Sequence, residues 1–307
     1  MSLLSLLIAL AAERSLSAKV WRFNFYYQHY LHFFSKNFTA KQGTIASVVF
    51  ILLPVMATYF LLELIDNSVM QLVISTLVLI VCFGCTTTRN SYKSYLHSAF
   101  RGEETTTAMH HQQLLSDKNL PNMGFGPALI WLNYRYYIAI MLYFTVFGAA
   151  GAVFYRLLTS VIEHKKSQCI ASENESKAQA EANSVAESDT EHEVQHEGNV
   201  APTIINGCQN HHDVLYWLDW LPVRVASFGY MFVGHFSKAM PVWLDSLFDS
   251  QKPTHQILID VAQKSEDIMV NKDDCTAEPC LLVRLAKRNV LLVLAVISIL
   301  TLAGLLN

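Results

Sequence analysis

Long apolar runs, separated by polar segments, are the main pattern along this chain of 307 residues. Each run has about 17 to 20 residues, the length with which a helix crosses the hydrocarbon core of a bilayer. Backbone polar groups inside that core must be bonded within the segment, so each run is expected to be helical. The pattern predicts four transmembrane helices, at Ser47–Leu64, Val69–Cys85, Ile138–Leu158 and Val290–Leu306.

Two further apolar segments do not fit a simple crossing. Ser2–Ala12 covers only about half of a ~30 Å core at about 1.5 Å per residue, which predicts a short, tilted or half-inserted helix. Leu221–Val242 has an apolar centre but contains Arg224, His235 and Lys238. This second segment fits either a polar crossing or a re-entrant helix.

The distribution of charge predicts how the spans are oriented. Residues 13–43 hold five basic and one acidic side chain, and residues 87–136 hold five and three. The positive-inside rule places both segments in the cytoplasm. The Ile138 helix then leads outward, so residues 162–212, with nine acidic and three basic side chains, are expected to be a periplasmic, disordered linker. Basic residues before the last span then require a further crossing.

Composition agrees with a membrane protein. Hydrophobic residues make up 52% of the chain, charged residues only 15%, and the mean hydropathy is +0.28. We therefore expect an all-α, polytopic integral membrane helical bundle with cytoplasmic amphipathic helices and a disordered acidic loop. Its predicted parts are an N-terminal membrane region (1–161) with a cytoplasmic helical loop (87–136), the acidic linker (162–212) and a C-terminal membrane region (213–307).

Two helical segments are expected outside the spans. Phe23–Phe38 contains eight aromatic residues, a composition typical of a helix that lies at the headgroup level. Tyr92–Leu115 alternates polar and apolar residues at helical spacing, with a break at Gly102-Glu103-Glu104. The second segment is a candidate docking surface.

Several function classes lack their sequence signals. The net charge is −3 and no basic stripe is present, so a nucleic-acid partner is not expected. Phosphate-binding glycine loops and the Gly-x-Ser-x-Gly hydrolase motif are absent. Cys82 and Cys85 form a Cys-x-x-Cys without a second ligand pair, and the histidine pairs lack ligand spacing. Neither a metal nor another cofactor is therefore expected.

Ionisable and polar residues at the edges of spans are the first candidates for a ligand site. Glu13 and Arg14 end the short apolar helix, where charges are costly unless they meet water, headgroups or a partner charge. In Trp131–Tyr137, the side chains of Asn133, Arg135 and Tyr137 project in related directions if the segment is helical. These side chains are suited to bind a carboxylate or a phosphate. The alternative is an aromatic belt with Arg135 reaching the headgroups.

The segment Leu218–Arg224 is the most specific motif in the chain. It places Asp219 and Arg224 on either side of Pro222, and a bend at the proline would bring the two charges together. The alternative is an ion pair that fixes the entry of a membrane helix, with Pro222 in its first turn. Our hypothesis is that Asn133, Arg135, Asp219 and Arg224 line a polar groove that binds an anionic ligand.

Five blocks in order resemble the AmpE family: Glu13-Arg14, Trp131–Tyr137, Leu218–Arg224, Val233-Gly234-His235 and Ala239–Trp243. The resemblance covers most of the chain and adds His235 and Pro222 to the candidate site residues. It implies a multi-pass protein of the bacterial inner membrane, with the lipid bilayer as its partner. It further implies regulation of β-lactamase induction and a link to peptidoglycan recycling, beside the amidase AmpD.

AmpE proteins are in turn similar to the CobD/CbiB cobinamide synthases, through an Asp-x-x-x-Pro-Ala-Arg segment in which Val223 replaces the alanine here. The Gly-Arg-Asp-Thr element of that family is absent, and Leu132 stands where an acid would precede Asn133. A regulator rather than an enzyme is therefore expected. The alternatives are a membrane-embedded amide-forming transferase, which would need a nucleotide or divalent metal, and a small transporter.

Overall fold

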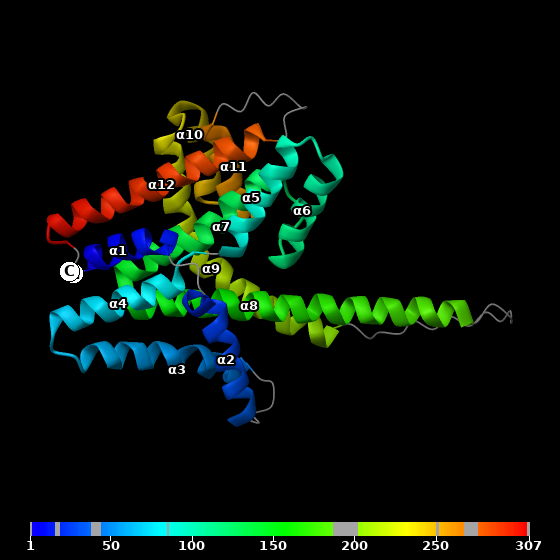
Figure 1. The fold of residues 1–307 in the computed structure, drawn as a ribbon, viewed down its shortest axis with the longest axis horizontal. Helices are drawn as coiled ribbons and strands as arrows, with labels where there is room; N and C mark the ends of the chain where they lie inside the picture. The colour runs from blue at the N-terminus through cyan, green and yellow to red at the C-terminus, as the bar shows by residue number, and fades with distance from the viewer. Residues whose placement is uncertain are drawn as a thin grey trace.

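The computed structural model describes residues 2–15, 19–37, 44–84, 86–186, 202–249, 252–266 and 276–305. These residues form helices and connecting turns and contain no strand, which confirms the all-α class (Figure 1). In chain order the elements are α1 (Ser2–Ser15), η1 (Lys19–Trp21), α2 (Phe23–Asn37), α3 (Thr44–Glu63), α4 (Ser68–Cys82), α5 (Thr86–Phe100), α6 (Glu104–Asp117), α7 (Phe125–Asn133), η2 (Tyr134–Ile138), α8 (Ala139–Ala186), α9 (Pro202–Val233), α10 (Phe236–Leu247), α11 (Thr254–Ser265) and α12 (Ala277–Leu302).

Three stretches of the described residues are helical, long and apolar enough to cross a bilayer: Ala46–Glu63, Phe125–Gln168 and Ala277–Leu302. The bent pair α4 and α5 counts as a fourth if it is one span. α1 is apolar but shorter, as predicted. Large apolar side chains such as Leu53 and Phe60 are exposed on α3. Because lipid is the solvent for such a surface, these helices form the wall of a membrane protein.

Residues 125–168 fold back on themselves instead of crossing once. Gly148 has φ 65° and ψ −159°, which interrupts the helix at that point. The Tyr136 hydroxyl donates to Glu163 at 3.0 Å although 27 residues separate the two. A straight helix of that length would hold them about 40 Å apart. The segment is therefore a helical hairpin, with η2 and the start of α8 in one arm and the rest of α8 in the other.

The hairpin corrects the predicted single span over Ile138–Leu158. Its turn lies in a run of small residues, Gly148-Ala149-Ala150-Gly151-Ala152. Gly148 has the positive φ that L side chains rarely adopt. A Cβ on Gly151 would approach the Tyr143 carbonyl oxygen to 2.5 Å, so the two arms meet at the backbone there. Hydropathy records the length of an apolar run and misses a turn inside it.

The hairpin also changes the predicted topology. Its second arm returns to the α6–α7 connection, where Lys166 Nζ donates to the Asn119 carbonyl at 2.6 Å and Asn119 Nδ2 donates to the Glu163 carbonyl at 3.3 Å. The residues that follow Glu163 therefore leave on the same side as the basic segment 87–136. The positive-inside rule predicts that this side is cytoplasmic, whereas the acidic segment was predicted to leave on the opposite side. No extra crossing is then needed before the last span.

The predicted linker, residues 162–212, is helical at both of its ends. α8 continues to Ala186 and α9 begins at Pro202, while residues 187–201 lie outside the described residues. Alanine, glutamate, lysine and glutamine are frequent in the α8 extension, and all four favour helix. Proline is well tolerated at the first helical position. For residues 187–201, disorder stays a prediction.

The segment Leu221–Val242 is neither a straight crossing nor the start of a helix. α9 passes through Pro222 without interruption, and the chain reverses at Gly234-His235 into α10. A Cβ on Gly234 would collide with the backbone of Ser265, so this reversal packs tightly against the end of α11. The Asn289 side-chain amide donates to the Ala226 carbonyl at 3.0 Å and ties α9 to α12. The segment is therefore part of a packed unit that consists of α9, α10, α11 and α12.

Helices expected outside the spans are confirmed. α2 covers the aromatic segment, with Phe23 and Tyr27 buried and Phe25 and Phe33 exposed. α5 and α6 are separated at the predicted break near Gly102, which has φ 71°.

Candidate functional site

Four consecutive residues, Tyr134 to Tyr137, each make a polar contact with a carboxylate. They lie in η2, a single π-helical turn in the first arm of the hairpin. Such turns widen a helix and often occur at functional sites. Tyrosines are the largest fully buried side chains of the described residues: Tyr134, Tyr136, Tyr155 and Tyr230. A buried hydroxyl needs a partner. Carboxylates supply one for Tyr134, Tyr136 and Tyr155.

Asp219 is held between the two arms of the hairpin. Its Oδ1 accepts hydrogen bonds from the Tyr134 hydroxyl at 2.7 Å and the Tyr155 hydroxyl at 2.8 Å. Only 1% of Asp219 is exposed. A buried carboxylate is costly without such donors, so the two tyrosines fix α9 to the hairpin at this point.

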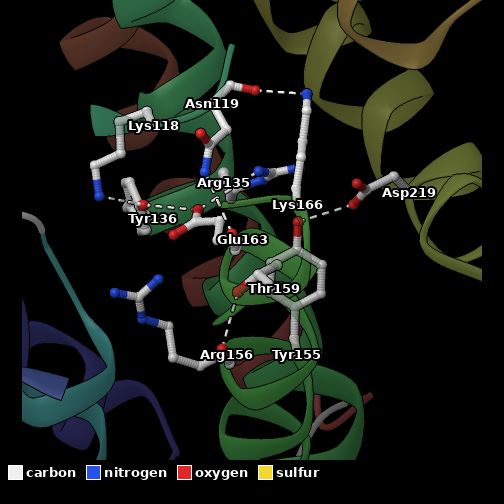
Figure 2. Close-up of polar contacts among 10 residues, drawn as sticks. All are labelled: Lys118, Asn119, Arg135, Tyr136, Tyr155, Arg156, Thr159, Glu163, Lys166 and Asp219. Atoms are coloured by element: carbon white, nitrogen blue, oxygen red, sulfur yellow. Dashed lines mark hydrogen bonds and ion pairs between the residues drawn. The ribbon is translucent and has the colours of Figure 1, made fainter. Parts of the chain in front are cut away.

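Glu163 receives two groups from η2 (Figure 2). The Arg135 guanidinium lies 3.6 Å from its Oε1, and the Tyr136 hydroxyl donates to the same oxygen at 3.0 Å. Lys118 Nζ donates in turn to the Tyr136 hydroxyl at 2.8 Å. Arg135 also stacks over the Trp131 ring, with its guanidinium carbon 5.1 Å from the centroid. The Glu163 carboxylate is therefore the centre of a partly buried ionic network.

The fourth contact joins η2 to α1. Tyr137 donates to Glu13 Oε1 at 3.1 Å, and Arg89 of α5 forms a hydrogen-bonded ion pair with the same oxygen. Gly84 lies directly against this carboxylate with φ 75°, and a Cβ there would collide with it. Glu13 therefore anchors the end of α1 at the junction of α4 and α5.

A cavity of about 620 Å³ lies beside this network, between α1, α2, the α4–α5 junction, the end of α6 and the second arm of the hairpin. Phe23, Tyr27, Ile80 and Phe83 form buried apolar wall, and Arg156 is buried among them. Its guanidinium carbon lies 4.4 Å from the Tyr136 ring and 5.0 Å from the Phe23 ring. In Figure 2, Arg156 and Lys118 lie on the side of the hairpin away from Asp219. Exposed polar side chains form the rim: Arg22, Asn24, Gln28, Thr87, Asp117 and Ser167.

Charged side chains of both signs line the cavity. Arg22, Lys118 and Arg156 line it, together with the carboxylates of Glu13, Asp117 and Glu163. Glu13 forms an ion pair with Arg89, and Glu163 forms one with Arg135. Neither arginine lines the cavity. The lining therefore holds three cations and three carboxylates, and two of these carboxylates are already paired with arginines outside the lining.

Tyr27 shows how the cavity affects a titrating group outside the spans. Burial, reinforced by the negative charge of Glu163, raises the pKa of the Tyr27 hydroxyl to about 12. The phenol therefore stays neutral in the cavity wall at physiological pH, where it presents a ring face and a hydroxyl.

The predicted site residues do not form one groove. Glu13 is the one member of the predicted set that lines the cavity among the described residues. Arg135, Tyr137 and Asp219 belong to the network behind it, and Asn133 is half-buried, with its Oδ1 atom enclosed and without a hydrogen-bond partner in the described structure. The Arg14 side chain lies outside the described residues. Whether any of these residues binds a ligand stays a prediction.

The proposed pairing of Asp219 with Arg224 was wrong. Arg224 is buried, but its guanidinium donates to backbone carbonyls at and after the end of α10: Leu247 at 2.6 Å, Asp249 at 2.9 Å and Ser246 at 3.3 Å. It also donates to the Trp220 carbonyl at 2.9 Å. Because Pro222 does not bend the chain back, the two side chains keep separate partners. Pro222 is buried inside α9, and His235 is exposed where α10 begins.

Sequence reasoning missed three central residues, Arg156, Glu163 and Lys118. Arg156 lies inside the predicted span Ile138–Leu158, and a charged residue in such a span is itself a functional signal. Glu163 follows seven residues later, which places it on the same helix face as Arg156. Lys118 lacks any such signal, because its partner Tyr136 is brought to it only by the tertiary fold.

Metal ligation finds no support among the described residues, where no group of three or more histidine, cysteine, aspartate or glutamate side chains is placed to hold an ion. Cys82 is buried as a free thiol, and Cys85 lies outside the described residues.

Comparison with known proteins gives one consistent result. A family model described as "Regulatory signalling modulator protein AmpE" matches residues 1–185 and 205–307. "Protein AmpE" from Shigella flexneri is 27% identical over 261 residues, which covers 80% of each chain. No solved structure matches this chain.

Proposed function

Because this chain belongs to the AmpE family of regulatory signalling modulators, we propose that it regulates β-lactamase induction from the bacterial inner membrane by binding an anionic peptidoglycan fragment in its cavity. The observation that carries the proposal is the buried Arg156 in the wall of a cavity in which two of the three lining carboxylates, Glu13 and Glu163, are already paired with other arginines. The proposal does not require catalysis or a cofactor.

The shape and chemistry of the cavity fit a fragment that combines sugar and peptide carboxylates. Arg156 at the buried wall and Lys118 nearby supply charge-assisted hydrogen bonds to a carboxylate. The rings of Phe23 and Tyr27 offer the apolar face against which a sugar packs. Asn24, Gln28 and Ser160 add uncharged hydrogen-bonding groups.

The position of the cavity favours a cytoplasmic ligand. The first of the two basic segments supplies Arg22, and the second supplies Lys118. The positive-inside rule places both in the cytoplasm, where the amidase AmpD is expected to trim the same fragments. We propose a functional link with that amidase through the shared ligand.

Glu163 gives a route by which occupancy would reach the C-terminal helices. It lines the cavity and pairs with Arg135, and the same guanidinium interacts electrostatically with Asp219 on α9. An anion bound beside Glu163 would change the position of the Arg135 side chain between the carboxylates of Glu163 and Asp219. The hairpin would then pass the change to α9.

Calorimetric titration of the detergent-purified protein with an anhydro-muropeptide tests the proposal. Arg156→Gln should weaken binding by at least tenfold, because it removes a buried charge from the cavity wall. Arg101→Gln is the matched control, since Arg101 is exposed and outside the cavity. Undetectable fragment binding, or equal binding by Arg156→Gln, would contradict the proposal. A parallel titration with a nucleotide tests the transferase alternative, which predicts nucleotide binding instead.

A further inference from the structure

The helix α10 has three distinct faces. Ala239 and Ser246 are buried against the protein, and Val242 and Trp243 pack on the same cluster. Lys238 and Asp245 lie together on a second face, which is exposed and charged. The third face is exposed and apolar. It consists of Phe236, Met240 and Leu244, four residues apart, and of Phe248 just after the helix, which is 87% exposed.

This third face is larger than ordinary scattered exposure. Residues at a spacing of four follow one side of a helix, so the four side chains form a continuous strip. Soluble surfaces rarely carry such strips without a covering partner. Ala239 is buried and Val242 and Trp243 are partly buried on another side of the helix, so the strip does not take part in this packing.

The neighbouring helix α9 carries a matching strip. Its exposed side chains recur at intervals of three and four residues, and Trp217 is 70% exposed. The two charged residues within this part of α9 do not interrupt the strip, because Asp219 and Arg224 are both buried with partners of their own. The strip consists of Val214, Trp217, Leu221, Val225, Phe228 and Phe232.

The helix that carries the second strip packs against a candidate membrane span. α9 packs on the candidate span α12 where Asn289 bonds to Ala226 and fits against Gly229. Beyond that contact, α12 exposes Leu291, Val296 and Ile299 along its apolar part. The charged side chains Lys287 and Arg288 come directly before the contact, as expected at a cytoplasmic boundary of the bilayer. The unit formed by α9 and α10 therefore sits at headgroup level.

The direction of α10 fits that level. In Figure 1 its ribbon runs across the direction of α12, as the ribbon of α2 runs across α3. A helix of 12 residues that lies across the spans can remain in the interface. α10 has one side against the protein, one apolar side and one charged side. Such a helix can insert its apolar side into the bilayer interface while its charged side stays in water.

We propose that α10 is an interfacial helix that lies in the cytoplasmic headgroup layer, with Phe236, Met240, Leu244 and Phe248 among the acyl chains. Its partner is the lipid surface itself, and Lys238 and Asp245 face the water. The inference does not rest on the proposed ligand of the cavity.

Site-directed spin labelling in lipid vesicles tests the proposal. Single cysteines at Met240, Leu244, Lys238 and Asp245 would be introduced into the full chain after its six native cysteines are replaced by serine. Labels at 240 and 244 should be reached by oxygen more than by a water-soluble nickel complex, and labels at 238 and 245 should show the reverse. Labels at Phe60 on α3 and Met109 on α6 give the lipid and water references, since both residues are exposed.

Two results would overturn the proposal. Nickel access to 240 and 244 equal to that at 109 would place the strip in water. Labels at 240 and 244 that are immobile and shielded from both reagents would show that protein covers the strip, and dipolar broadening between them would identify that protein as a second copy. Each labelled variant is accepted only if its circular dichroism and melting temperature match the cysteine-free chain.

Discussion

The Arg135 guanidinium lies 3.6 Å from the Glu163 carboxylate across the helical hairpin that turns at Gly148. This ion pair joins the two arms at the level where the second arm meets the cavity. Removing one partner of a buried pair leaves the other charge without compensation, which costs more than the pair itself contributes.

We expect Glu163→Leu to lower the free energy of unfolding by about 3 kcal/mol, because Arg135 would remain buried and unpaired. Thermal unfolding in detergent measures this change. The double variant Arg135→Leu/Glu163→Leu is the control, and it should recover most of the lost stability. A double variant no more stable than Glu163→Leu would show that the pair is not the cause.

The turn of the hairpin gives a second prediction. Gly148→Ala should destabilise the protein by about 1–3 kcal/mol, since only glycine adopts this backbone region without strain. A Cβ at this position would meet no atom within 4 Å, so a steric clash would not explain the loss. Val146→Ala, at an exposed position near the turn, serves as the control in the same melting experiment. An unchanged melting temperature for Gly148→Ala would contradict the hairpin turn.

Arg224 should act as a backbone cap for α10 and not as an ion-pair partner. Arg224→Lys retains the charge but loses the planar set of donors that reaches the carbonyls of Leu247, Ser246 and Asp249. Hydrogen exchange, followed by mass spectrometry, should therefore become at least tenfold faster in α10 and remain unchanged in α1. If Arg224→Lys leaves exchange in α10 unaltered, the capping role fails.

The raised pKa of Tyr27 predicts a loss of stability at high pH. Its hydroxyl titrates at about 12 in the folded protein and near 10 when unfolded. The stabilisation is therefore complete below pH 10 and is lost as the pH rises toward 12. Melting temperatures measured over this window should fall less steeply for Tyr27→Phe than for the natural chain. Identical slopes would show that Tyr27 does not titrate in this way.

The sequence predicted the class of fold because apolar length and charge bias depend on the bilayer alone. It placed α3 and α4 close to their observed positions, whereas α12 begins at Ala277 and not at the predicted Val290. It did not predict the hairpin, since Gly148 lies within an unbroken apolar run and nothing local distinguishes a turn there from close helix packing. The helical ends of the predicted linker, residues 162–186 and 202–212, were missed for a related reason, because a polar sequence rich in alanine and glutamate also forms helix.

The candidate site was predicted only in part. Glu13, Arg135 and Asp219 were found because charges in apolar surroundings are costly and so conspicuous. Their partners depend on long-range packing: Arg89 approaches Glu13 across 76 residues, and Tyr134 reaches Asp219 across 85. An expected bend at Pro222 suggested that Asp219 would pair with Arg224, but α9 continues through the proline, and residues five apart in a helix do not face each other. The cavity itself has no sequence signal.

Regulation in cells tests the central claim most directly. β-Lactamase induction would be measured in cells that lack this chain and are complemented with the natural protein, Arg156→Gln or Arg101→Gln, at equal amounts in the membrane fraction. Our account predicts that Arg156→Gln behaves like the absence of the protein, while Arg101→Gln restores normal induction. Normal induction with Arg156→Gln would contradict the claim that the cavity is the regulatory site.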